Sequence, residues 1–170
     1  MTLEELRETI PPFAKDLSLN LSSVLGDGAL DEKTRWGVAL ACALATDSKP
    51  LRDAIGEGAV RLGGDAVVDD ARAAASLMAM NNVYYRFRHM IGKESYSQKP
   101  ARLRMTRIAK PATDKATFEL MCLAVSAING CEACVRSHEA TLVAAGVSED
   151  AIHDAVRIAS TLRGVATALA

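Results

Sequence analysis

Apolar residues recur three and four positions apart along most of the chain, which is the spacing of one face of an α-helix. Phe13, Leu17, Leu21 and Val24 follow this spacing and predict a helix over 13–25. The same pattern predicts helices over 32–46, 49–62, 66–91, 114–128, 131–145 and from 149 onward. No segment alternates apolar and polar residues between hairpin turns, as a β-strand would. The pattern therefore predicts an all-α fold.

The predicted helices begin and end at residues that favour helix termini. Thr2 and Glu5 have the spacing of a capping box, and Pro11 and Pro12 end the short helix that follows. Candidate N-caps for later helices are Asp31, Ser48 and Ser148. We expect a break near Asn81–Asn82, a loop over 92–100 and a short helix over 101–109.

A weak internal repeat relates the two halves of the chain. A shift of 82 positions places Trp36 on Phe118 and Glu57 on Glu139, and a shift of 84 places Asp70 on Asp154. Such matches predict one domain, residues 1–170, built from two weakly related helical halves. With the shift of 82, the first half has Lys49 and Arg52 where the second has Cys131 and Cys134. Only the second half would then carry thiol chemistry.

Composition and charge exclude several classes of partner. The net charge is −1 and only 4% of residues are aromatic, so nothing indicates binding to nucleic acid or to an anionic membrane. A short basic stretch, Arg102 to Lys110, is expected to be a solvated helix face. The longest apolar run, over 36–45, is far shorter than the ~20 residues of a membrane span. The acidic N-terminal segment does not resemble a signal peptide, so we expect a cytoplasmic protein.

Two cysteines and a histidine lie close together in the segment SAINGCEACVRSHE, at Cys131, Cys134 and His138. Three interpretations compete: a redox-active dithiol, half of a zinc site, or two buried cysteines beside a surface histidine. Zinc would need a fourth ligand, and the chain has neither a second cysteine pair nor a His-x-x-x-His motif. We expect no bound metal. Cys42 and Cys122 lie among apolar residues and are predicted to be core, and His89 and His153 to be structural or surface residues.

The helix predicted to begin at Cys131 favours the dithiol. Free N–H groups and the positive end of the helix dipole stabilise a thiolate in the first turn, where the pKa of a thiol commonly falls from about 8.5 to about 7 or below. His138 follows Cys134 by four residues and so shares its helix face. His138 could therefore act as the base for Cys134. This makes Cys134 the attacking thiol and Cys131 first the proton donor and then the resolving thiol.

Glu119 is a candidate partner of His138. If helices 114–128 and 131–145 pack antiparallel about Asn129–Gly130, Glu119 lies about 16 Å from the break and His138 about 12 Å, at 1.5 Å per residue. This offset allows a direct or water-bridged contact. Glu119 would then act as a relay that orients the imidazole and raises its basicity.

These residues resemble the AhpD family of alkyl hydroperoxide reductases, within the carboxymuconolactone decarboxylase-like superfamily. The resemblance spans the whole chain and includes LSLNLSSVL, MAMNNVYYR at 78–86, TFEL and AVSAINGC. It implies a helical homotrimer that acts as a lipoyl-dependent thiol peroxidase on organic hydroperoxides or regenerates a peroxiredoxin. It also implies a redox disulfide between Cys131 and Cys134, with Cys134 forming the sulfenic acid, and a relay through His138 and Glu119.

The same resemblance implies that no cofactor is bound and that dihydrolipoamide donates the electrons. The donor would be carried by a lipoylated acyltransferase and recharged by dihydrolipoamide dehydrogenase. One position departs from the family pattern, because Ala133 stands where a histidine precedes the second cysteine. We expect this change to tune the rate. Two alternatives stay open: a decarboxylase-like member of the superfamily, and a non-enzymatic helical module with structural zinc at Cys131, Cys134 and His138.

Overall fold

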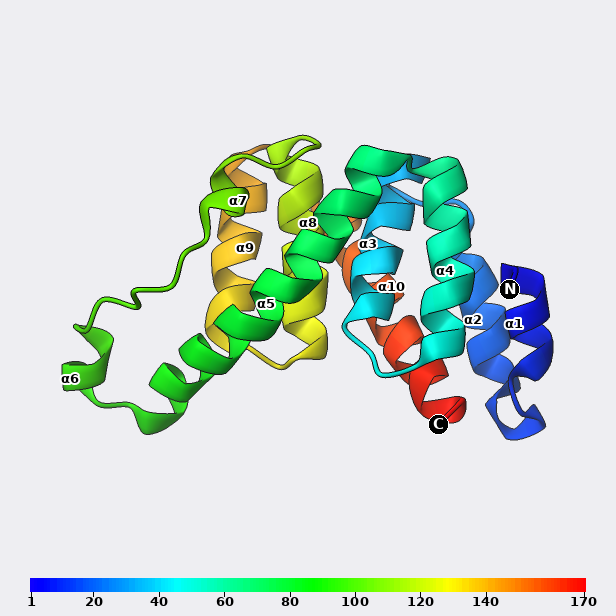
Figure 1. Ribbon diagram of the computed structural model, residues 1–170, viewed down its shortest axis with the longest axis horizontal. Helices are drawn as coiled ribbons and strands as arrows, with labels where there is room; N and C mark the ends of the chain where they lie inside the picture. Colours follow the sequence, from blue (N-terminus) through cyan, green and yellow to red (C-terminus); the bar gives the residue numbers. More distant parts are fainter.

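The computed structural model describes residues 1–170 and contains helices and no strand, which confirms the predicted all-α class (Figure 1). In chain order the elements are α1 (Leu3–Thr9), a 3-10 turn (Pro12–Ala14), α2 (Lys15–Leu25), α3 (Glu32–Leu44), α4 (Lys49–Leu62), α5 (Asp65–Ile91), α6 (Glu94–Ser97), α7 (Thr106–Ala109), α8 (Lys115–Ile128), α9 (Glu132–Ala144) and α10 (Glu149–Ala168). None of these helices is both long and apolar enough to cross a membrane.

Side-chain caps fix where the helices begin. Thr2 and Glu5 form the predicted capping box of α1. Asp31, Ser48 and Ser148 each accept a hydrogen bond from the backbone N–H three residues further on, as N-caps do. The N-terminal boundaries of these helices are therefore encoded locally.

The predicted break of α5 near Asn81–Asn82 is wrong, because the helix runs unbroken over 27 residues. Asparagine disfavours helix interiors when its side chain competes for nearby backbone groups. Here both side chains are buried and bond to other elements instead. Asn81 Nδ2 lies 2.9 Å from Met105 Sδ, and Asn82 Nδ2 donates to Ser126 Oγ at 3.0 Å. These tertiary contacts remove the competition with the backbone.

The segment from 92 to 110 also departs from the prediction. It leaves the bundle at the end of α5, forms the single turn α6 and returns to α7 (Figure 1). Only Thr106–Ala109 of the predicted 101–109 helix is helical, and Arg102 has a φ of 52°, which a helix excludes. Arg107 does not lie on a solvated face, because its guanidinium pairs with Asp69 and, at 2.7 Å, with buried Asp70.

Asp70 anchors this returning segment to α5. It accepts hydrogen bonds from the backbone N–H of Ala112 at 2.9 Å and of Thr113 at 2.7 Å, and from the Thr113 hydroxyl at 2.6 Å. Burial raises the pKa of Asp70, but the bonds from Thr113, Ala112 and Arg107 outweigh this effect and hold the pKa below its usual value. The ionised carboxylate therefore ties α7 and the start of α8 to the bundle.

Two three-helix units, α3–α4–α5 and α8–α9–α10, meet through α3 and α8 in the centre of the molecule. Each central helix also packs against the last helix of both units. The Thr34 and Thr117 hydroxyls lie 3.2 Å apart at the contact between the central helices. Both threonines hydrogen-bond the aspartate that caps their own helix, Asp31 or Asp114. The two weakly related halves expected from the sequence are present as structural units.

The caps correct the register of the repeat. Asp31 and Asp114 cap α3 and α8, and Ser48 and Cys131 occupy the N-cap positions of α4 and α9. Both pairs are 83 positions apart, not 82. Trp36 therefore corresponds to Glu119 and not to Phe118. In this register Ser48 and Leu51, not Lys49 and Arg52, correspond to the two cysteines.

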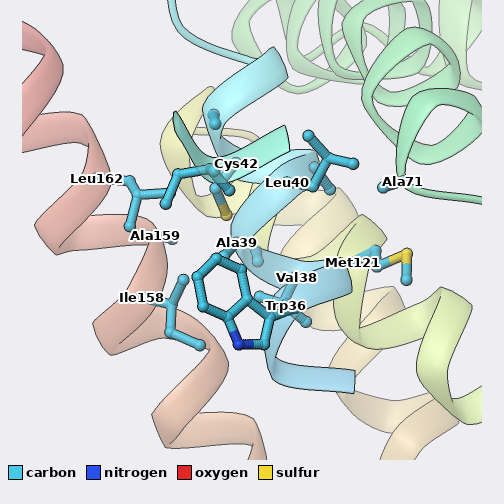
Figure 2. Close-up of a cluster of buried hydrophobic side chains, with 14 of the residues drawn as sticks. Trp36, Val38, Ala39, Leu40, Cys42, Ala71, Met121, Ile158, Ala159 and Leu162 are labelled. Carbon is cyan, nitrogen blue, oxygen red and sulfur yellow. The ribbon is translucent and has the colours of Figure 1, made fainter. Parts of the chain in front are cut away.

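Trp36 belongs to the main hydrophobic core, which is continuous across both units (Figure 2). It lies with Val38, Leu40, Ile158 and Leu162 around α3 and α10. A Cβ on Gly58 of α4 would lie 2.1 Å from the indole ring, so the absence of a side chain there is what allows α4 to approach Trp36. The first unit thus fills with an indole the region where the second unit has Glu119.

Candidate active site

A cavity of about 350 Å³ lies between α5, α8, α9 and the segment that contains α7. α5 contributes Met78, Asn81 and Tyr85 to its wall, and α7 and the residue before it contribute Ile108 and Met105. The remaining lining residues come from α8 and α9: Glu119, Ala133, Cys134, Ser137, His138 and Thr141. A mostly apolar pocket with a few convergent polar groups is typical of a small-molecule site.

Cys131 and Cys134 form a disulfide, with their Cα atoms 5.3 Å apart. Cys131 is fully buried, whereas Cys134 is 7% exposed and lines the cavity. In this disulfide form Cys134 lines the cavity and Cys131 does not. This difference in access distinguishes the two sulfurs.

The turn between α8 and α9 places the cysteines at the start of a helix. Asn129 is the C-cap of α8, and Gly130 has a φ of 65°, a left-handed conformation that favours glycine. Cys131 is the N-cap of α9, so Cys134 is the third residue of the helix. After reduction, both sulfurs would lie at the positive end of the helix dipole, which stabilises a thiolate.

The structure brings His138 and Glu119 together beside Cys134. His138 Nδ1 lies 2.6 Å from Glu119 Oε2, and the two side chains are only 12% and 6% exposed. If Nδ1 carries the proton and donates it to the carboxylate, Nε2 keeps a free lone pair that can accept a proton. Nε2 lies 3.3 Å from Met78 Sδ, and Met78 also lines the cavity. In this disulfide form, neither ring nitrogen has a hydrogen bond to a cysteine sulfur.

The other cysteines and histidines lie outside this site. Cys42 and Cys122 are buried in the core as predicted, and burial raises the pKa of both thiols, so both stay protonated. His153 is exposed, and His89 lies 3.4 Å from Glu132 at the surface. No group of three histidine, cysteine or acidic side chains is arranged to hold a metal ion. The structure therefore offers no support for the zinc alternative.

Seven residues that line the cavity were not among the residues predicted from sequence: Met78, Asn81, Tyr85, Met105, Ile108, Ser137 and Thr141. The three residues on α5 have the spacing of a single helix face, which is a signal that the sequence contains. The spacing does not show which other part of the protein this face of α5 contacts. Met105 and Ile108 are placed by the return of the segment to α5, which depends on the ion pair between Arg107 and Asp70.

The first unit has no equivalent site. Trp36, Leu51 and Ile55 occupy the positions that correspond to Glu119, Cys134 and His138, and all three are buried apolar residues. The second unit thus has a cavity where the first unit has filled hydrophobic core.

Comparisons with known proteins give consistent results. A family model described as the carboxymuconolactone decarboxylase family matches residues 95–170. The chain is 58% identical over 167 residues to the alkyl hydroperoxide reductase AhpD of Anaeromyxobacter dehalogenans (strain 2CP-C), covering 98% of this chain and 90% of that protein. It is 51% identical over 170 residues to the AhpD of Solibacter usitatus (strain Ellin6076), covering 99% and 96%. Identity to the AhpD of Rhodopseudomonas palustris (strain BisA53) is 50% over 169 residues, covering 99% and 93%.

Proposed function

The chain belongs to the AhpD family of alkyl hydroperoxide reductases, and on this premise we propose that it reduces organic hydroperoxides through a Cys131–Cys134 dithiol. It is an oxidoreductase of the peroxidase type. One observation carries the proposal: Cys134 lines a cavity that is also lined by the paired residues His138 and Glu119. A nucleophile, a base and a carboxylate that orients the base are thus within one site.

The first step is attack by Cys134. His138, oriented by Glu119, takes the proton from the Cys134 thiol, and the thiolate attacks the terminal oxygen of the hydroperoxide. The O–O bond breaks, and Cys134 becomes a sulfenic acid. The alkoxide leaves as an alcohol with the proton of Cys131. Apolar residues of the cavity, Met105 and Ile108 among them, suit the alkyl part of the substrate.

The second step closes the disulfide. The Cys131 thiolate attacks the sulfur of the Cys134 sulfenic acid, and the departing hydroxide takes the proton held by His138 and leaves as water. The net reaction converts one hydroperoxide and two thiols into an alcohol, water and one disulfide. The disulfide in the structure corresponds to this end point.

The disulfide must then be reduced by an external dithiol through thiol–disulfide exchange. Following the resemblance to the family, the donor in the proposal is dihydrolipoamide on a lipoylated acyltransferase, recharged by dihydrolipoamide dehydrogenase. The proposal also includes assembly as a homotrimer in the cytoplasm and regeneration of a peroxiredoxin as a further role. Exposure favours Cys134 as the sulfur that the donor attacks first, because Cys131 is fully buried.

The decisive experiment measures consumption of an organic hydroperoxide with dihydrolipoamide as donor, for wild type beside Cys134→Ser. The wild type should turn over, and the variant should lose activity because it lacks the attacking thiol. Cys42→Ala is the matched control, since this thiol is buried in the core, does not line the cavity and should not matter. Full activity of Cys134→Ser would overturn the assignment.

A second variant separates the roles of the two thiols. In Cys131→Ser the first step leaves a sulfenic acid on Cys134 that no resolving thiol can remove, so a dimedone adduct should accumulate at Cys134. An adduct on any other cysteine would contradict these roles. A decarboxylase-like member of the superfamily would not consume hydroperoxide with any dithiol donor, which the wild-type assay tests directly.

A further inference from the structure

One face of α5 follows the turn that carries the dithiol. Asn82, Arg86 and His89 are four and three residues apart, so they lie on one side of the helix. Each contacts the segment from Ser126 to Glu132, which joins α8 to α9. We name these three residues the α5 clamp. None of them lines the cavity or contacts either cysteine.

Asn82 makes the buried part of the clamp. Its side chain is 1% exposed, and both ends of its amide are used. Nδ2 donates to Ser126 Oγ at 3.0 Å, and Oδ1 accepts from Asn129 Nδ2 at 2.9 Å. Ser126 is itself fully buried. Loss of one partner in such a buried pair leaves polar groups unsatisfied, so this contact holds the turn firmly against α5.

Arg86 and His89 extend the contact toward the surface. Arg86 Nη1 donates to the main-chain oxygen of Asn129 at 2.6 Å. His89 Nε2 lies 3.4 Å from Glu132 Oε2, but both side chains are more than half exposed, so this pair adds little. Buried Asn82 therefore carries most of the clamp, and exposed Arg86 adds a weaker bond to the main chain of the turn.

The turn that they hold is short. Gly130 alone separates Asn129, the C-cap of α8, from Cys131, the N-cap of α9. The N–H of Cys131 also donates back to the Ser126 carbonyl at 3.1 Å. Fixing Ser126 and Asn129 against α5 thus fixes the backbone of Cys131 relative to the first turn of α9, where Cys134 lies.

We propose that the α5 clamp is a positioning device that sets the reduction potential of the Cys131–Cys134 pair. A turn held in place keeps the two sulfurs close, which favours the disulfide over the dithiol. A loosened turn lowers the effective concentration of one thiol at the other, so the disulfide becomes easier to reduce and slower to close. The proposal rests on the proposed function only in treating this pair as redox-active.

The test measures the equilibrium of the pair with reduced and oxidised dithiothreitol, read out by alkylation and mass spectrometry, with no peroxide present. Asn82→Leu removes the buried amide, and Arg86→Met removes the bond to the Asn129 carbonyl while keeping most of the side chain's length. Arg52→Met is the matched control. Arg52 of α4 donates from Nη1 to the carbonyl of Thr46 at 2.9 Å. Thr46 corresponds to Asn129 at the spacing of 83, so this bond holds the equivalent carbonyl on the turn between α3 and α4, which carries no thiol.

We expect Asn82→Leu to shift the equilibrium constant tenfold or more toward the dithiol, which is about 30 mV for a two-electron couple. Arg86→Met should shift it in the same direction by several-fold, and Arg52→Met should leave it at the wild-type value. Thermal unfolding of all three variants checks that they fold. A shift in Arg86→Met no larger than that in Arg52→Met overturns the proposal, even if Asn82→Leu does not fold.

These outcomes are independent of the proposed function. If the wild type consumes no hydroperoxide, the peroxidase proposal fails, but the effect of the clamp on the thiol–disulfide equilibrium is still measured. If the wild type is an active peroxidase and the variants show wild-type equilibria, only the clamp proposal fails.

Discussion

Replacing Glu119 by glutamine tests whether the carboxylate assists His138. Glu119 Oε2 and His138 Nδ1 are 2.6 Å apart, and both side chains are largely shielded from water, so the bond is a strong one. Hydrogen bonds to a charged group contribute about 1.5–3 kcal/mol, and neutral ones about 0.5–1.5 kcal/mol. Glu119→Gln keeps the size of the side chain and loses about 1–2 kcal/mol of stabilisation as the imidazole takes up a proton. This difference corresponds to about a 5–30-fold loss in kcat/KM.

A glutamine can also donate its amide N–H to Nδ1 of His138 and so select the tautomer whose Nε2 is already protonated. This second effect adds to the loss in kcat/KM. Steady-state consumption of an organic hydroperoxide, measured with a saturating dithiol donor, gives kcat/KM for both proteins. The deficit should shrink as the pH rises above the pKa of the Cys134 thiol, because ionisation then no longer needs the base.

Glu139→Gln is the control for this experiment, since Glu139 is an exposed residue on the same helix as His138. It removes the same charge without touching the imidazole and should keep wild-type kcat/KM. The reasoning is refuted if Glu119→Gln retains wild-type kcat/KM at about pH 6, where the thiol is still protonated, or if its deficit is the same at every pH.

Two further predictions concern stability and thiol reactivity. Asp70→Asn should lower the free energy of unfolding in urea by about 1.5–3 kcal/mol at pH 7, because the buried carboxylate loses its charge-assisted hydrogen bonds from Arg107, Ala112 and Thr113, whereas exposed Asp69→Asn should cost at most about 1 kcal/mol. The folded-state pKa of Asp70 is lowered, so the stabilisation by its ionised carboxylate is fully present above the unfolded pKa of about 3.9 and is lost as the pH falls through the folded-state pKa. The difference in unfolding free energy between wild type and Asp70→Asn should therefore narrow on acidification. After reduction, iodoacetamide should label Cys134 in the folded protein, while Cys42 and Cys122, whose pKa values are raised by burial, should react only after unfolding; labelling of either at the rate of Cys134 would contradict this assignment.

Several features of the fold could be read from local sequence. The positions of Thr2, Asp31, Ser48 and Ser148 marked four helix N-termini, and the structure places all four as caps. A cap depends on a residue and the backbone three positions later, so a single sequence contains all the information that it needs. The pairing of Cys131 with Cys134 is also a local property, because the two residues are only three positions apart.

Contacts between distant segments could not be read in this way. The Asn81–Asn82 pair suggested a broken helix because propensity considers only the helix itself. In the structure, Met105 and Ser126 accept the side-chain N–H groups of these two residues from outside the helix. Arg107 looked solvated for the same reason, since its partner Asp70 lies 37 positions earlier. The register of the repeat was off by one because alanine-rich segments match one another at several shifts, and only the caps fix the alignment.

The sequence by itself determined that the chain is helical, where most helices begin, and that two thiols and one imidazole lie within two helical turns, because these properties depend on residues no more than a few positions apart. Only the tertiary structure decided that Cys134 and not Cys131 meets a cavity, that α5 supplies one wall of it, and that Trp36 fills the corresponding region of the other unit. Access and burial arise when segments distant in the chain pack together, and no spacing along one sequence specifies which of two neighbouring sulfurs faces the space that remains.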